Sequence, residues 1–136
     1  KIPFQDTYTV GKELGRLAEL AQIANQLGET AARDTYLAVI KTELQEWFTA
    51  GGKEFVYNTE WGTLQGYPAS FDTEKQLNDH NFHYGYFVQA AATVGMFDKA
   101  WVAQDQWGGM VDLLVADVAN TSRDSDAFPW LRSLDP

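Results

Sequence analysis

The sequence predicts an all-α fold built from antiparallel helical hairpins, and three features of the chain support this prediction. Apolar residues recur at spacings of three and four along several long segments, which is the pattern of helices that bury one face. Glycines stand where these segments end, as is typical of helix C-termini. The connection between the first two segments is very short, so we expect these two helices to pack antiparallel.

The first helix is expected from Gly11 to Gly28, with Gly28 as a left-handed cap. The second is expected from about Thr30 to Phe48, where Gly51 and the glycine after it stop it. Each helix has one apolar face that would be buried. These faces comprise Leu14, Leu17, Ala18, Ala21, Ala24 and Leu27 in the first helix, and Tyr36, Leu37, Ile40, Leu44, Trp47 and Phe48 in the second.

Two further helices are expected in the second half of the chain. One should run from about His80 to Val94, with a glycine near its end. The next should begin after Asp98 as its N-cap, with apolar residues on both sides of the cap in the positions of a hydrophobic staple. The pair Gly108-Gly109 either breaks this last helix in two or marks close packing against a neighbour.

Between the second and third helices lies a long, aromatic-rich loop, from Gly51 to Leu77, in which a short strand around Phe55 is possible. Loops of this length are usually functional or disordered, and the many rings argue against disorder. Rings interleaved with amides and hydroxyls suit a sugar-binding cleft, since the apolar face of a pyranose packs on a ring. The alternative is that the rings belong to the core. The rings in question are Tyr57, Trp61, Tyr67 and Phe71.

Length and charge limit the possible functions. The 136 residues suit one domain, and the net charge of −9 argues against a nucleic acid or an anionic membrane as partner. No cysteine is present, so disulfides and thiolate metal sites are excluded, and no apolar run is long enough to span a membrane. The chain begins with Lys1 and ends soon after large apolar residues, so we expect it to be part of a longer polypeptide.

A titratable cluster lies between Leu77 and Phe87, where the loop enters the third helix. Three interpretations remain open for it. Asn78 or Asp79 caps the helix; or Asp79 donates or accepts a proton, with its pKa set by burial among aromatic rings; or a metal binds the histidines. His80 and His83 share a helix face, but no HExxH pattern and no further histidine or cysteine supports a metal.

The same stretch resembles the signature of a known enzyme family. Asn78-Asp79-His80-Asn81-Phe82-His83-Tyr84-Gly85-Tyr86-Phe87, followed by Ala90-Ala91-Ala92, is similar to the NDHHFHYGYF…AAA motif of glycoside hydrolase family 81. This motif is long and unusual, and the similarity extends over most of the chain. Further landmarks that fit the family are the Leu14–Gly28 helix, Tyr57-Asn58-Thr59-Glu60-Trp61-Gly62, Asp98-Lys99-Ala100-Trp101 and the segment from Phe128 to Pro136.

The resemblance implies a secreted, cofactor-independent endo-β-1,3-glucanase that cleaves laminarin-like glucans with inversion. It also implies an (α/α)6-barrel catalytic domain beside a β-sandwich, of which residues 1–136 would be a part that is incomplete at both ends. The rest of the parent polypeptide is then a necessary partner. In this family the aspartate of the motif is the general acid, here Asp79. This chain has Asn81 where the family has a histidine, and the family's general base, a glutamate in an ESSSE-like motif, is expected beyond Pro136.

Roles for the other candidate residues follow from the chemistry of sugar binding. We expect His80, His83 and Tyr84 to bind sugar hydroxyls, and Tyr57, Trp61 and Tyr67 to stack on sugar rings. The acid must stay protonated, and the neighbouring rings would favour its neutral form. A non-catalytic glucan-binding fragment and a purely structural helical piece are the alternatives. Without a general base, the 136 residues alone are expected to be inactive, and exposed helix faces would make them unstable alone.

Overall fold

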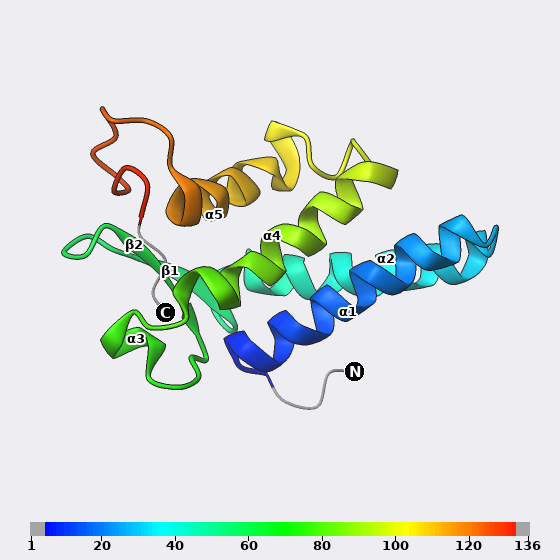
Figure 1. Ribbon diagram of the computed structural model, residues 1–136, viewed down its shortest axis with the longest axis horizontal. Coiled ribbons are helices and arrows are strands. Elements are labelled where there is room, and N and C mark those ends of the chain that lie inside the picture. The colour runs from blue at the N-terminus through cyan, green and yellow to red at the C-terminus, as the bar shows by residue number, and fades with distance from the viewer. Residues whose placement is uncertain (1–4, 133–136) are drawn as a thin grey trace.

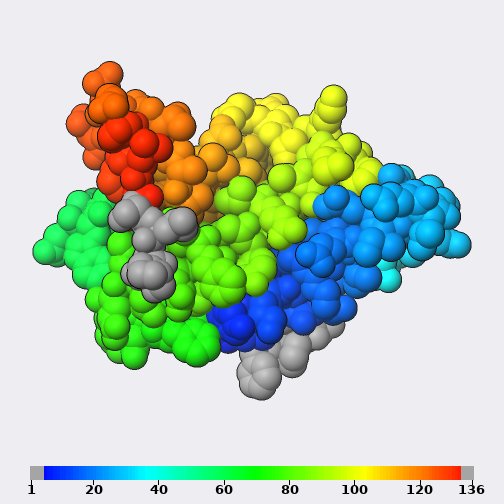
Figure 2. Space-filling view, viewed as in Figure 1, coloured from blue at the N-terminus to red at the C-terminus, as the bar shows by residue number. Residues whose placement is uncertain are grey.

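Two helical hairpins lie side by side in the computed structural model, which describes residues 5–132 (Figure 1). The first hairpin pairs α1 (Thr7–Gln26) with α2 (Thr30–Trp47), and the second pairs α4 (His80–Phe97) with α5 (Gly109–Ala119). Helices α1 and α4 run in the same direction and pack against each other along one face of the molecule (Figures 1 and 2). Their N-terminal ends therefore meet at one end of the molecule.

Helix α1 begins at Thr7, four residues before the predicted start at Gly11. The reason is a cap that the apolar pattern does not show, because Asp6 Oδ1 accepts hydrogen bonds from the N–H groups of Tyr8 (3.0 Å) and Thr9 (2.9 Å). The predicted C-terminal cap is confirmed. Gly28 has φ +77°, and the N–H of Glu29 reaches back to a carbonyl of the last helical turn.

The predicted all-α fold is incomplete, because the segment from Gly51 to Leu77 is not a simple loop. It contains an antiparallel hairpin of β1 (Glu54–Asn58) and β2 (Thr63–Tyr67), followed by the short helix α3 (Thr73–Gln76). The register pairs Glu54 with Tyr67 and Asn58 with Thr63. Packing explains the hairpin, since Phe55 fits between the rings of Trp47, Tyr84 and Phe87 at centroid distances of 5.4, 5.1 and 5.2 Å.

The capping bond predicted at Asp98 is present, because Asp98 Oδ1 accepts from the Trp101 N–H (3.1 Å), but a turn and not a helix follows it. Asp98 also ends α4, where its N–H donates to the carbonyl of Val94 (2.8 Å), and its Oδ2 accepts from Lys41 (2.6 Å). A π-helical turn, η1 (Gln104–Gly108), precedes α5. Close packing explains Gly108, because a Cβ there would lie 2.3 Å from the Val102 carbonyl oxygen, whereas a Cβ at Gly109 would meet nothing closer than 3.9 Å.

The core lies between the two hairpins, and helix α4 is its centre. Small residues on α1 let it approach α4 closely, and large apolar side chains from α2, α4 and α5 fill the remaining space. Within the described part of the chain, no helix combines the length and the apolar character needed to cross a bilayer. Fully buried core residues include Leu14, Ala18, Ala21, Ile40, Leu44, Trp47, Phe87, Ala90, Ala91, Val94 and Leu114.

Two helical glycines allow a matched test of the α1–α4 contact. A Cβ at Gly15 would lie 2.8 Å from the ring of Tyr86, whereas a Cβ at Gly85 would meet nothing within 4 Å. We expect Gly15→Ala to lower the free energy of unfolding by about 1–3 kcal/mol through overpacking. Gly85→Ala should raise it by roughly 0.5–1 kcal/mol, because alanine favours the helix. Urea unfolding of both variants checks this, and equal effects would contradict the close packing.

Candidate active site

Asp79 is the last residue before α4, and its backbone is left-handed, with φ 54° and ψ 16°. Its carboxylate makes no capping hydrogen bond to α4, so the interpretation of Asp79 as a side-chain helix cap is wrong. A left-handed conformation is uncommon outside glycine and costs free energy. The half-buried carboxylate thus lies at the N-terminus of α4 but makes no hydrogen bond to the N–H groups of the first helical turn.

The strain is not confined to Asp79. Phe71, Asp72 and Leu77 also have φ 57°, so four left-handed residues other than glycine lie within nine positions of the chain. Hydrogen bonds hold this loop in place: the N–H of His83 donates to the Asp79 carbonyl (2.9 Å), and Asn78 Nδ2 donates to the Phe71 carbonyl (3.2 Å). Concentrated backbone strain of this kind is typical of functional sites.

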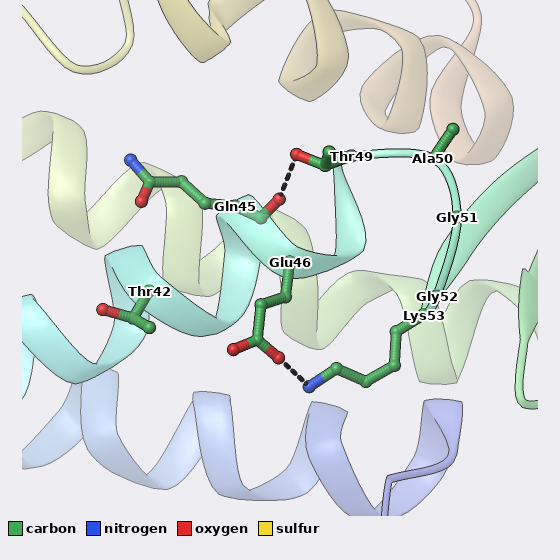
Figure 3. Close-up of a pocket in the computed structure, with 8 residues that line it drawn as sticks. All are labelled: Thr42, Gln45, Glu46, Thr49, Ala50, Gly51, Gly52 and Lys53. Carbon is green, nitrogen blue, oxygen red and sulfur yellow. Dashed lines mark hydrogen bonds and ion pairs between the residues drawn. The ribbon is translucent and has the colours of Figure 1, made fainter.

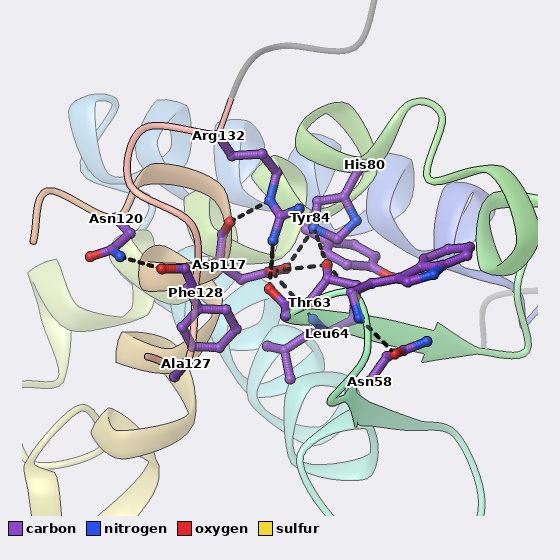
Figure 4. Close-up of polar contacts among 12 residues, drawn as sticks. Asn58, Thr63, Leu64, His80, Tyr84, Asp117, Asn120, Ala127, Phe128 and Arg132 are labelled. Carbon is purple, nitrogen blue, oxygen red and sulfur yellow. Dashed lines mark hydrogen bonds and ion pairs between the residues drawn. The ribbon is translucent and has the colours of Figure 1, made fainter. Parts of the chain in front are cut away.

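His80 lies inside the protein, in a buried polar network (Figure 4). Its Nε2 stands 2.6 Å from Asp117 Oδ2, a distance that requires the imidazole to donate. The other carboxylate oxygen of Asp117 accepts from Thr63 Oγ1 (3.1 Å), the Leu64 N–H (3.3 Å) and Arg132 Nη2 (3.0 Å). Asp117 is fully buried, and all of these donors compensate its lost hydration.

The Asp117 network joins segments that are far apart in the sequence. Arg132 also donates to the carbonyls of Gly62 (2.9 Å) and Asp117 (2.9 Å), so the C-terminal segment is tied to the β-hairpin turn and to α5. Through His80 the same network fixes the first turn of α4. It therefore holds in place the residue that directly follows Asp79.

His83 and Tyr84 are also buried and have protein partners. The Nδ1 of His83 lies 3.3 Å from Thr7 Oγ1, and the hydroxyl of Tyr84 accepts from the Gly66 N–H (2.6 Å). Only 3%, 1% and 3% of His80, His83 and Tyr84 are exposed. The structure thus turns all three predicted hydroxyl-binding side chains inward, and their contact with sugar remains a prediction. Burial also raises the pKa of the Tyr84 hydroxyl well above its ordinary value, which keeps it protonated.

Burial lowers the pKa of His83 from 6.5, against the opposing attraction of the Asp79 and Asp6 carboxylates. The unfolded chain therefore binds a proton more readily than the folded chain, and the stability that His83 contributes is lost as pH falls below about 6.5. We expect His83→Gln to reduce the slope of unfolding free energy against pH in this window. Urea unfolding at pH 5 and pH 7 tests it, and an unchanged slope would contradict the assignment.

The three predicted stacking rings, Tyr57, Trp61 and Tyr67, are all part-exposed, but the hairpin separates them. Tyr57 pairs with Leu64 and Tyr67 pairs with Glu54, so these two tyrosines project from opposite faces of the hairpin. The Tyr57 hydroxyl also donates to the Ala127 carbonyl. Trp61 lies in the turn, where its N–H bonds to Asn58. A single sugar ring cannot stack on both tyrosines.

Sequence reasoning missed Asp117 and Arg132. A signal for Asp117 existed, because it follows Leu114 by three residues and so shares the buried face of α5. An acidic side chain on such a face needs partners. No comparable signal marked Arg132, whose role depends on the fold of the segment before it. Among residues 5–132, no group of three or more metal-ligating side chains stands together.

A hollow of about 480 Å³ lies where α2 turns toward β1 (Figure 3). It is open to solvent, and Lys53 crosses it to pair with Glu46 at 2.7 Å. Neither Asp79 nor any predicted sugar-binding residue lines it. Its lining residues are Thr42, Gln45, Glu46, Thr49, Ala50, Gly51, Gly52 and Lys53.

Comparison with known proteins agrees with the Asp79 motif. A family model described as the glycosyl hydrolase family 81 C-terminal domain matches residues 1–136. The chain belongs to glycoside hydrolase family 81. It is 48% identical over 135 residues to a glucan endo-1,3-beta-D-glucosidase of Thermobifida fusca and 47% identical to one of Acetivibrio thermocellus, in each case over 96% of this chain.

A solved structure shares the fold. A glycoside hydrolase family 81 protein from Clostridium thermocellum, in a mutant form, superposes with a TM-score of 0.89 at 47% identity over 96% of this chain. This chain spans 18% of the length of the two relatives and 19% of the solved chain.

Proposed function

We propose that this chain is part of an enzyme that hydrolyses internal β-1,3-glucosidic bonds of laminarin-like glucans with inversion, and that Asp79 is its general acid. The placement of Asp79 carries this proposal. Its carboxylate makes no capping hydrogen bond to α4 and belongs to a loop with several left-handed residues. It lies where the N-terminal ends of α1 and α4 meet. Membership of family 81, whose relatives are glucan endo-1,3-beta-D-glucosidases, supports the substrate.

We further propose that the two hairpins are consecutive units of an (α/α)6 barrel. In such a barrel the inner helices are neighbours and run parallel, while the outer helices return. Helices α1 and α4 fit the inner positions because they run in the same direction and pack together, and α2 and α5 fit the outer ones. Residues 1–136 would then be a partial catalytic domain, completed by the rest of the polypeptide.

The proposed chemistry needs two carboxyl groups. Asp79 would protonate the leaving glycosidic oxygen, and a carboxylate about 6.5–9.5 Å away would activate the attacking water. Asp117 is not suited to be that base, because it is fully buried and bound to His80 and Arg132. We therefore propose that the base comes from the polypeptide beyond Pro136, and that residues 1–136 alone do not hydrolyse glucan.

Since the substrate is a polymer too large to enter a cell, we propose that the enzyme is secreted.

The direct test is to follow laminarin hydrolysis by the full-length polypeptide with proton NMR. An inverting enzyme releases the α-anomer from a β-glucan, and an endo-acting one yields a range of oligosaccharides from the start of the reaction. First appearance of the β-anomer would indicate retention and would contradict the assigned mechanism. Binding of laminarin without any release of reducing ends would favour the non-catalytic alternative.

A further inference from the structure

We infer that Tyr8, Phe71 and Phe82 form an aromatic platform that binds a glucosyl ring of the substrate beside Asp79. This inference rests on the proposed function and names a subsite for it. The platform combines the first turn of α1, the loop before α3 and the first turn of α4. The ring of Tyr8 meets that of Phe71 edge-to-face (centroids 5.3 Å apart, interplanar angle 82°) and is tilted 37° from that of Phe82 (centroids 6.2 Å apart), so Tyr8 joins the three rings into one cluster.

The two phenylalanines are unusually exposed for their size. Phe71 is 64% exposed and Phe82 is 54% exposed, although large apolar side chains gain free energy by burial. Phe71 also carries the cost of a left-handed backbone, which is a rare conformation for a bulky residue. A ring that is both strained and exposed contributes little to folding. Both costs are offset if a ligand or another part of the polypeptide covers the ring, and the position of the rings beside the Asp79 loop favours a ligand.

The platform is linked directly to the candidate acid. Asn78, the residue before Asp79, donates to the Phe71 carbonyl (3.2 Å), and Phe82 stands three residues after Asp79 in the first turn of α4. His83 lies beneath the rings, with centroid distances of 5.4 Å to Tyr8 and 6.2 Å to Phe71. Since burial lowers the pKa of His83, its imidazole stays neutral at neutral pH, and the rings of the platform pack on an uncharged side chain.

The surroundings suit a sugar better than a hydrocarbon. Lys12 Nζ lies 5.4 Å from the Tyr8 ring centroid, and the Asp6 carboxylate and Ser70 hydroxyl both bond to the Tyr8 N–H. Stacking on rings with charged and hydroxyl groups at the edge is how proteins bind pyranoses, because the sugar has apolar faces and a hydroxylated rim. The platform therefore fits a glucosyl unit next to the bond that is cleaved.

The test uses the full-length polypeptide with Phe71→Ala, Phe82→Ala and the double substitution. The control is Met96→Ala, which removes a 63% exposed apolar side chain at the other end of α4. We expect each ring deletion to raise KM for laminarin roughly 3- to 10-fold, with kcat within about twofold and thermal stability unchanged. Phe82→Trp, unlike Phe82→Ala, should leave KM for laminarin near the wild-type value, because the larger ring can still stack on the sugar.

A KM equal to that of the control in both ring variants would overturn the platform. A fall in Tm without a change in KM would overturn it as well, since the rings would then pack against another part of the polypeptide. Calorimetric binding of laminari-oligosaccharides in an Asp79→Asn background separates this inference from the proposed function. Weaker binding on ring deletion supports the platform even if the wild-type polypeptide proves not to hydrolyse glucan.

Discussion

Asp79→Asn should lower kcat for laminarin by roughly 10²–10⁴-fold while changing glucan affinity little. The amide is nearly the same size as the carboxyl group but cannot donate an acidic proton to the leaving oxygen. Because the Asp79 side chain makes no capping bond to α4, its replacement removes no hydrogen bond that the helix needs. Reducing-sugar release and calorimetric binding on the full-length polypeptide measure the two effects separately.

Asp72 provides a matched control for this substitution. It lies in the same loop, has the same left-handed backbone (φ 57°), and its exposed carboxylate pairs with Lys75 at 2.8 Å. Surface ion pairs contribute little, so Asp72→Asn should leave both kcat and stability nearly unchanged. Equal loss of activity in the two variants would mean that loop conformation, and not proton donation, explains the result. Full activity of Asp79→Asn would rule out Asp79 as the acid.

The helices were predictable because their signals are local. The period of apolar residues placed α1, α2 and α4, and Gly28 marked the end of α1 as the structure confirms. Errors arose where a helix boundary depends on a single side chain. Asp6 starts α1 before its apolar face begins. Asp98 does accept a capping bond from the Trp101 N–H, but the chain makes only a turn there, and the next helical segment begins at Gln104.

The site was only partly predictable, because burial depends on tertiary contacts. The motif located Asp79, and its αL backbone supports a special role. The same motif predicts that His80 and Tyr84 bind a sugar, but it could not show that both side chains are buried and have protein partners, His80 in Asp117 and Tyr84 in the Gly66 N–H. Two-residue periodicity around Phe55 indicated a strand, yet it could not show that a second strand pairs with it or that helices cover it.

Asp117→Ala should cause the largest loss of stability of any substitution considered for this chain. The side chain is fully buried, and its removal leaves Arg132 without its counter-charge and the N–H of His80 without its acceptor. Removal of one partner from a buried ion pair typically costs about 3–5 kcal/mol, which is a large part of a domain's stability. Asp117→Asn, which keeps an oxygen acceptor for the Thr63 and Leu64 donors, should cost less.

The exposed Asp112 on the same helix is the control for the Asp117 substitutions, and Asp112→Ala should leave the melting temperature nearly unchanged. Hydrogen exchange of the full-length Asp117→Ala polypeptide should then show faster exchange in the β-hairpin and the first turn of α4, since Asp117 joins both through Leu64 and His80. Because His80 directly follows Asp79, kcat should fall along with stability. Loss of stability with normal kcat and unchanged exchange in α4 would show that the network supports the fold but does not position the acid.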